Sequence, residues 1–274
     1  MSYSFMRWPN FKIRALTFSY DDGDIADRRV IEQFNQYGMK GTFNLNSNSV
    51  GKEHRVTKEE LSSLYEKAGH EVATHGRFHY SFDEVPSSMI MDEILDDRKF
   101  YEGILKHPVT GHAYPNGSFS DRTAEVLRQC GISYARTIQS TGKFTIPTNW
   151  LQWHPTSFHK DRRLMEYIEE FLSISPTHYF HQRALLLYIW GHSYEFDRDN
   201  CWHILDEIGE KLGNREDIWY ATNMEIYEYV NAYNSLVFAA NGESVKNPSG
   251  LDVCICYFGK NYVIPAGTTI EIEK

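Results

Sequence analysis

Two adjacent carboxylates stand where a run of β-forming residues ends, and they carry the clearest chemical signal in the chain. The run Arg14–Tyr20 leads directly into Asp21, Asp22 and Gly23. Two neighbouring aspartates repel each other in a folded protein unless a positive charge lies beside them. A metal cation would supply that charge, and it would leave one carboxylate free to accept a proton.

Two histidines follow a second candidate strand further along the chain. The run 70–74 ends at His75, and His79 comes four residues later. On a helical turn or a tight loop, this i,i+4 spacing brings the two imidazoles together. One aspartate and two histidines make a three-ligand site with an open position, as a catalytic metal requires. The sequence therefore predicts a metal site.

Four stretches resemble, in the same order, the motifs of the polysaccharide deacetylases, also known as NodB-homology or carbohydrate esterase family 4 proteins. They are Ser19–Gly23, Gly69–His79, Ala113–Gly117 and Ile189–His192. The resemblance extends over residues 12–235. It implies an α/β fold of the NodB type, a distorted (β/α)7-type barrel.

The resemblance also implies a role for each residue that matches a motif. Asp22, His75 and His79 would hold the divalent metal, most often Zn²⁺ in this family, although Co²⁺, Mn²⁺ and Fe²⁺ suit the same ligands. Asp21 would be the general base, and His192 would be the general acid. The remaining matches would form the substrate pocket and the oxyanion site: Tyr114, Pro115, the backbone N–H of Asn116, and Trp190. Trp190 could alternatively be an ordinary core residue.

The expected activity is removal of acetyl groups, N-acetyl in preference to O-acetyl, from a carbohydrate or oligosaccharide by metal-activated water. A neutral leaving group needs a proton donor that titrates near neutrality, as histidine does. Two alternatives stay open. One is hydrolysis of a non-sugar amide C–N bond on the same scaffold, and the other is a non-catalytic protein that holds a metal and binds sugar. The intact Asp21 argues against the second, because binding requires no base.

The third motif departs from the pattern of many family members, which carry there an arginine that orients the base aspartate. The matching position in this chain is Ala113. The Asp-and-Trp stretch of the fourth motif has no clean match either. Arg136 and Arg77 are candidates to orient Asp21 instead, and the sequence does not decide between them.

Two further segments could contribute to the site. Aromatic faces stack on sugar rings, so we predict that one aromatic segment forms a further substrate wall, with the side chains of Trp150, Trp153 and His154. The alternative is that the two tryptophans are buried in the core. Either Glu195 or Asp197, which closely follow His192, could fix the tautomer of His192 and raise its pKa.

Runs of strand length alternate with helix-like segments, which predicts an α/β fold with its site at the carboxyl ends of parallel strands. The predicted strands are residues 14–20, 41–46, 70–75, 109–114, 133–138, 150–154 and 184–190, and the predicted helices are 25–37, 58–68, 88–105, 121–130 and 164–172. Beyond residue 235, short runs separated by turn residues predict a small C-terminal antiparallel β extension packed on the barrel. The predicted domains are therefore residues 1–235 and 236–274.

Composition restricts the classes of partner. The 274 residues carry a net charge of −9 and contain no Lys/Arg cluster, so nucleic acid and membrane are not expected partners. No apolar run approaches the roughly 20 residues of a membrane helix. The polar start of the chain, with Pro9, does not match a signal peptide, and we expect a cytoplasmic protein. The expected partner is an acetylated carbohydrate, and the oligomeric state stays open.

Overall fold

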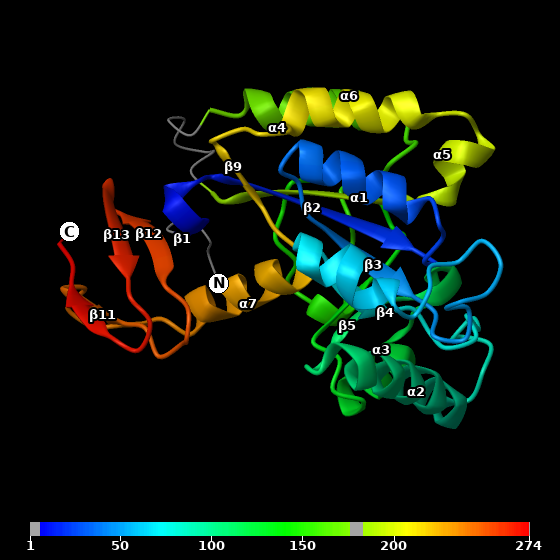
Figure 1. Ribbon diagram of the computed structural model, residues 1–274. Helices are drawn as coiled ribbons and strands as arrows, with labels where there is room; N and C mark the ends of the chain where they lie inside the picture. Colours follow the sequence, from blue (N-terminus) through cyan, green and yellow to red (C-terminus); the bar gives the residue numbers. More distant parts are fainter. Residues whose placement is uncertain (1–5, 176–182, 274) are drawn as a thin grey trace.

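The computed structural model describes residues 6–175 and 183–273. Eight parallel strands form a curled sheet at its centre (Figure 1): β2 (Arg14–Asp21), β3 (Gly41–Leu45), β4 (Glu71–Thr74), β5 (Gly111–Ala113), β6 (Tyr134–Arg136), β7 (Ser157–Phe158), β8 (Leu185–His192) and β9 (Ile218–Tyr220). Their order is β6-β5-β4-β3-β2-β8-β7, and β9 pairs with the first half of β2. The predicted distorted α/β barrel is confirmed.

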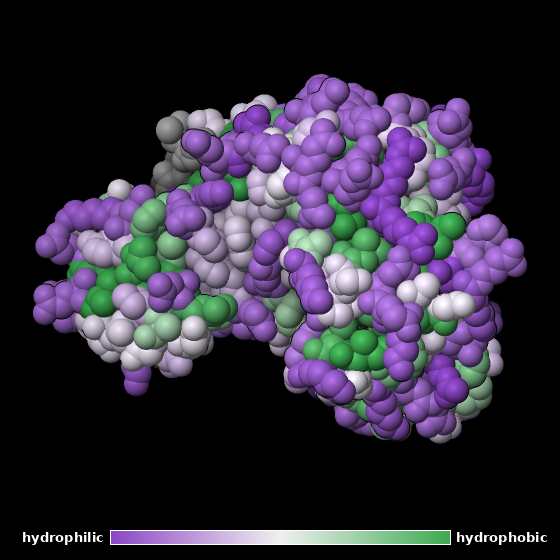
Figure 2. All heavy atoms as spheres, in the orientation of Figure 1, coloured by the Kyte–Doolittle hydropathy of each residue, from purple (hydrophilic) through white to green (hydrophobic). Residues whose placement is uncertain are grey.

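Helices surround the sheet (Figure 1): α1 (Asp27–Gln36), α2 (Ser87–Leu105), α3 (Asp121–Gln129), α4 (Leu164–Ser173), α5 (Tyr194–Arg198), α6 (Trp202–Leu212) and α7 (Asn223–Asn234). The buried faces of α1, α4 and α6 pack with β2, β3 and β8 in the largest apolar cluster. The opposite side of α4 and α6 faces solvent and is mostly hydrophilic (Figure 2). Among the described residues, no helix combines the length and the apolar character needed to cross a bilayer.

The two central strands place the chemical residues side by side. Every residue of β2 is buried, as is β8 from Leu185 to Gly191, which explains why both read as nearly continuous apolar runs. In the parallel register, Asp21 pairs with Asn44 of β3 and with His192 of β8. The carboxyl ends of these strands therefore meet at one edge of the barrel.

Two predicted elements differ from the structure because local turn chemistry prevails. Residues 150–154 do not form a strand: Trp150–Gln152 is a 3-10 turn, and only Trp153 makes a single bridge to Arg136. The Asn149 side chain accepts a hydrogen bond from the Leu151 N–H and winds the chain into this turn. The predicted helix 58–68 is a π-helical turn followed by a 3-10 turn.

Other differences concern helix ends and short elements. The N-cap of α3 is Ser120, because Ser120 and Thr123 form a reciprocal capping box. Five elements of the barrel domain were not predicted: β7, β9, α5, α6 and α7. The two strands have only two and three residues, too few for an alternating pattern to stand out.

Two three-stranded antiparallel sheets form the C-terminal extension. One contains β10 (Val237–Phe238), β11 (Ser244–Lys246) and β14 (Thr269–Glu271), and the other contains β1 (Met6–Arg7), β12 (Val253–Tyr257) and β13 (Lys260–Ile264). The prediction did not include β1, which comes from the start of the chain. Apolar side chains of both sheets share one cluster with α7 and β8. The division at residue 235 stays a prediction, and residues 1–5 and 274 of the predicted domains lie outside the described residues.

We expect Tyr229→Phe to loosen this extension. The Tyr229 hydroxyl donates to the Arg7 carbonyl at 2.6 Å and accepts from the Cys254 N–H at 2.9 Å, and the side chain is 3% exposed. Because both partners lose a hydrogen bond in a buried place, the free energy of unfolding should fall by about 1–3 kcal/mol, measured by chemical denaturation. Tyr262→Phe, which loses one exposed hydrogen bond from the Glu273 N–H, is the matched control. Equal losses in the two variants would contradict the prediction.

Candidate metal and catalytic site

The carboxyl ends of several barrel strands meet around a cavity of about 320 Å³. Both predicted catalytic residues and all three predicted metal ligands line this cavity. The complete lining is Asp21, Asp22, His75, His79, Tyr114, Asn116, Gly117, Ile138, Trp190, His192 and Tyr194.

Asp22, His75 and His79 direct one ligand atom each to a common centre. Nε2 of His75 lies 3.2 Å from Nε2 of His79 and 3.8 Å from Oδ1 of Asp22, and Oδ1 of Asp22 lies 3.6 Å from Nε2 of His79. A point equidistant from three atoms with these separations lies about 2.1 Å from each, which is the length of Zn–N and Zn–O bonds. The three side chains therefore fit a divalent first-row metal.

Hydrogen bonds orient His75 for this role. Nδ1 of His75 lies 2.8 Å from the Ala113 carbonyl. Because a carbonyl only accepts, Nδ1 carries the proton and Nε2 presents its lone pair to the common centre. The His75 N–H donates to the Leu45 carbonyl and to Asp97 of α2. Burial raises the pKa of Asp97 to about 7.

The two neighbouring aspartates have different surroundings. Asp21 completes β2 and is 2% exposed. Asp22 adopts a left-handed φ of 77° immediately after the strand, and its side chain is partly exposed. This turn separates the two carboxylates, so Asp22 faces the histidines while Asp21 points into the barrel.

Arg136 is the residue that orients Asp21. It is fully buried, and its Nη2 donates to both carboxylate oxygens of Asp21, at 2.5 Å from Oδ1. Asn44 Nδ2 also donates to Oδ1, at 2.8 Å. Arg136 pairs in register with Ala113, so the charge missing from position 113 comes from the adjacent strand. Arg77, the other candidate, pairs with Asp96 instead.

These contacts keep Asp21 ionised. Burial raises its pKa, but Arg136, His75 and His192 outweigh burial, and the pKa of Asp21 falls to about 2. Asp21 is therefore a carboxylate throughout the neutral range, with both oxygens held by hydrogen-bond donors.

His192 lies next to Asp21, with Nε2 3.9 Å from Asp21 Oδ2. On its other side, Nδ1 lies 3.6 Å from Glu195 Oε2, an electrostatic contact longer than a good hydrogen bond. Burial lowers the pKa of His192, but Glu195 and Asp21 outweigh burial, so the pKa is raised. Asp197, the other predicted partner, accepts a hydrogen bond from Trp202 Nε1 instead.

His159 was missed by the sequence analysis. It is fully buried, and its Nε2 lies 2.8 Å from Oε2 of Glu195, the oxygen that faces His192. A Cβ on Gly191 would lie only 2.5 Å from Nδ1 of His159, so this strand position requires glycine. A glycine inside a buried strand marks such a close approach, and it is the only signal the sequence offers for His159.

The predicted pocket residues from the third and last motifs lie at the cavity or directly behind it. Tyr114 and Trp190 are 1% and 8% exposed and form buried walls. The Tyr114 hydroxyl donates to the Leu151 carbonyl, and the Arg136 guanidinium lies 4.7 Å from the Trp190 ring centre. Pro115 is buried, and Asn116 turns the chain with a left-handed φ of 54°.

The predicted aromatic substrate wall is corrected by the structure. Trp153 is 1% exposed and packs against Tyr134 and Tyr188 in the core, because the turn at 150–152 directs it inward. Trp150 packs edge-on against Trp153 and Tyr227. Neither tryptophan reaches the cavity that contains Asp21.

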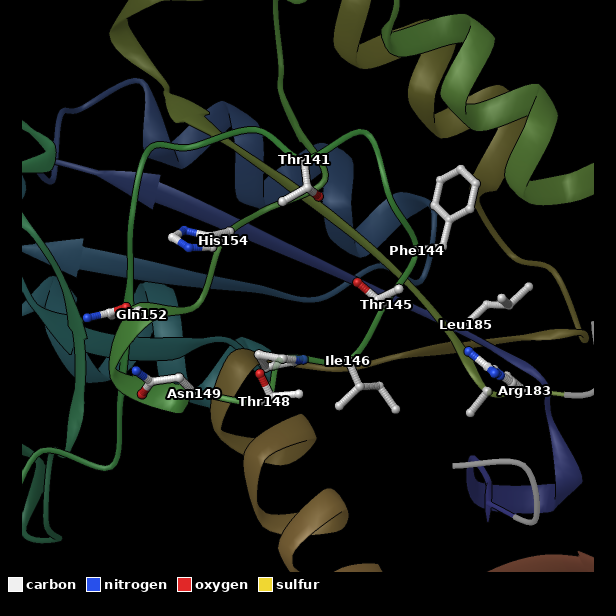
Figure 3. A pocket seen from close by; sticks show the side chains of 12 residues that line it. Thr141, Phe144, Thr145, Ile146, Thr148, Asn149, Gln152, His154, Arg183 and Leu185 are labelled. Carbon is white, nitrogen blue, oxygen red and sulfur yellow. The ribbon is translucent and has the colours of Figure 1, made fainter. Parts of the chain in front are cut away.

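His154 belongs to a different cavity of about 560 Å³, shown in Figure 3. Its Nδ1 lies 2.6 Å from the Thr137 hydroxyl. Polar side chains of this second cavity are already bonded to their surroundings: Thr141 donates to the Pro155 carbonyl, and Gln152 donates to Asp121. Thr145, Thr148 and Arg183 are further polar residues that line this cavity.

Comparisons with known proteins agree with this geometry. A family model described as Polysaccharide deacetylase matches residues 9–135. Over these residues, which make up just under half of the chain, the sequence is similar to the polysaccharide deacetylase family. The matched segment contains the aspartate pair and the histidine pair, and it ends before Arg136 and His192.

Two curated relatives share part of this deacetylase segment. The peptidoglycan-N-acetylglucosamine deacetylase of Bacillus cereus is 26% identical over 122 residues, which cover 44% of this chain and 54% of the relative. YxkH of Bacillus subtilis, assigned as a polysaccharide deacetylase, is 20% identical over 127 residues, which cover 46% of this chain and 45% of the relative. The alignments thus span about half the length of these relatives.

Solved structures agree on the deacetylase fold. A protein of Mycobacterium smegmatis assigned as a polysaccharide deacetylase has a TM-score of 0.62 at 17% identity, covering 84% of this chain and 94% of that chain. The family 4 carbohydrate esterase of Streptomyces lividans, solved with acetate, has a TM-score of 0.51 at 12% identity, covering 76% and 90%. At these identities the similarity supports the barrel and carries no residue role.

We expect Arg136→Met to destabilise the metal-free protein by about 3–5 kcal/mol at pH 7, because the buried Asp21 carboxylate loses its counter-charge. The folded pKa of Asp21, about 2, lies below the unfolded value of about 3.9. Ionised Asp21 therefore stabilises the wild-type fold above pH 4, and this contribution is lost as the pH falls through 2. Without Arg136 the pKa of Asp21 rises, so the difference between wild type and variant should narrow toward acid pH.

Denaturation at several pH values in the presence of a chelator measures this effect. Asp21→Asn combined with Arg136→Met should recover much of the loss, since no buried charge remains. Arg77→Met removes an exposed ion pair with Asp96 and should cost less than about 1 kcal/mol. A loss that is independent of pH, or that the double variant does not recover, would show that Arg136 acts by packing alone.

Proposed function

We propose that this protein is a metal-dependent hydrolase that removes acetyl groups from a carbohydrate, N-acetyl groups in preference to O-acetyl groups. One observation supports this most strongly: an ionised, immobilised Asp21 lies 3.9 Å from His192 beside three converging ligand atoms. A protein that only held a metal or a sugar would not need this pair of proton acceptor and proton donor. The relative named peptidoglycan-N-acetylglucosamine deacetylase supports an acetylated amino sugar as the substrate class.

Asp22, His75 and His79 would hold the divalent metal, with Zn²⁺ the first choice and Co²⁺, Mn²⁺ or Fe²⁺ suited to the same ligands. When bound, such a cation polarises an acyl carbonyl and makes a water molecule more acidic. The contact between Nδ1 of His75 and the Ala113 carbonyl keeps Nε2 of His75 unprotonated for this purpose.

Protons would be handled by side chains on neighbouring strands. An Asp21 oxygen accepts a proton from the attacking water, while Arg136 and Asn44 keep the carboxylate in position. His192 donates a proton to the departing nitrogen as the bond from nitrogen to the acetyl carbon breaks, so the products are acetate and an amine. The raised pKa of His192 favours the charged form that can donate this proton.

The cavity walls would bind the acetyl group itself. The backbone N–H of Asn116 would donate to the developing oxyanion, in the left-handed turn that follows Tyr114. Tyr114 and Trp190 are large, buried rings on the cavity wall and would enclose the acetyl methyl group.

Acetate release from tetra-N-acetyl-chitotetraose tests this proposal. Zinc-loaded protein should release acetate, metal-stripped protein should not, and zinc should restore the activity. Asp21→Asn should lower kcat/KM by at least about a hundredfold because the proton acceptor is lost. The variant must still fold and bind zinc, and Asp92→Asn, on the exposed face of α2, is the matched control. Release that is independent of metal, or unchanged in Asp21→Asn, would refute the proposal.

The pH profile of kcat/KM should report on Glu195. A general acid works only while protonated, so activity should fall as the pH rises through the pKa of His192. Glu195 raises that pKa, and Glu195→Gln should therefore move the alkaline limb to lower pH. Asp197→Asn is the control, because Asp197 contacts Trp202 and not His192. If the alkaline limb lies at the same pH in Glu195→Gln and in Asp197→Asn, Glu195 does not raise the pKa of His192.

A further inference from the structure

Three large apolar side chains are exposed at or near the catalytic cavity: Ile138 (42% exposed) lines it, and Phe78 (43%) and Tyr80 (42%) are neighbours of His79, which also lines it. Phe78 and Tyr80 stand on either side of His79 in the sequence. Asn116 Nδ2 donates to the Ser81 hydroxyl at 3.0 Å and so joins this segment to the cavity wall. We call the pair Phe78 and Tyr80 the rim aromatics.

The rim aromatics pack against each other in a tilted arrangement. Their ring centres lie 5.8 Å apart, and the ring planes are inclined by only 33°. The guanidinium of Arg77 lies 4.7 Å from the Phe78 ring centre, and Arg77 is itself paired with Asp96 of α2. One face of the Phe78 ring is thus held by a cation whose charge is already compensated.

The backbone that carries the rim aromatics is fixed on both sides. The Phe78 N–H donates to Glu93 Oε2 at 2.7 Å, and the Arg77 carbonyl accepts from the Asn48 N–H. On the other side, the Phe82 N–H donates to the Ser118 hydroxyl at 2.7 Å. The aromatic surface is therefore already formed, and a ligand would lose little affinity to ordering this loop.

We propose that the rim aromatics bind the pyranose ring next to the acetylated sugar in an oligosaccharide. This inference rests on the proposed function. The catalytic cavity, about 320 Å³, is at the lower end of the range for ligand pockets, so a second sugar ring must lie at its rim. The apolar C–H face of a pyranose packs on an aromatic face. The pair also takes the role that the sequence analysis gave to Trp150 and Trp153, which pack in or against the core instead.

Chain-length dependence tests the rim aromatics. We expect wild-type kcat/KM to be higher for tetra-N-acetyl-chitotetraose than for N-acetylglucosamine. Phe78→Ala combined with Tyr80→Ala should lower the tetramer-to-monomer ratio about tenfold, as loss of an aromatic anchor does at other interfaces. The matched control is Phe258→Ala with Val263→Ala, two exposed apolar residues of the C-terminal extension, which should leave the ratio unchanged. No tetramer preference in the wild type, or an unchanged ratio in the rim variant, overturns the inference.

A binding measurement separates this inference from the proposed function. Calorimetric titration of metal-stripped protein with the same tetramer involves no turnover. Suppose that no form of the protein releases acetate, but the tetramer binds and the rim variant binds it about tenfold more weakly. The deacetylase proposal then fails, and the sugar-binding role of the rim aromatics stands. If acetate is released but the rim variant binds the tetramer as tightly as the wild type does, the role of the rim aromatics fails and the deacetylase proposal stands. If the tetramer binds neither the wild type nor the rim variant, the role of the rim aromatics is overturned.

Discussion

The ion pair between Asp21 and Arg136 lies inside the barrel, and the geometry of the site depends on it. The two residues are 2% and 0% exposed, and either charge alone would be costly to bury. Together they fix the end of β2 relative to the end of β6. The pair also resolves the repulsion between adjacent aspartates: Arg136 neutralises Asp21, and the left-handed turn at Asp22 leaves that carboxylate to the two histidines.

Holding Asp21 so tightly limits it as a base. A carboxylate with a pKa of about 2 has little affinity for a proton, so its contribution must come mainly from position and orientation. In the proposed reaction, the acidity of the attacking water would therefore come from the cation that the three ligands would hold. His192 has the opposite surroundings, because Glu195, itself fixed by buried His159, favours the charged imidazolium. Neighbouring strands thus hold a weak acceptor and a ready donor 3.9 Å apart.

Much of the site could be predicted because its residues follow buried strands that are visible in one sequence. Asp21, Asp22 and His75 come at strand ends, and the spacing to His79 needs no long-range information. The choice of Arg136 over Arg77 could not be predicted, since it depends on the register between β5 and β6. The inward turn of Trp153, the contact of His159 with Glu195 and the pairing of β1 with β12 likewise depend on contacts between distant segments.

Anomalous diffraction from zinc-soaked crystals, recorded on both sides of the zinc absorption edge, would locate the cation directly. The geometry described above predicts one strong peak bound by Oδ1 of Asp22 and by Nε2 of His75 and His79, with Asp21 still paired to Arg136. A peak bound by Asp21, a peak elsewhere on the barrel, or no peak at this cavity would contradict the division of roles between the two aspartates.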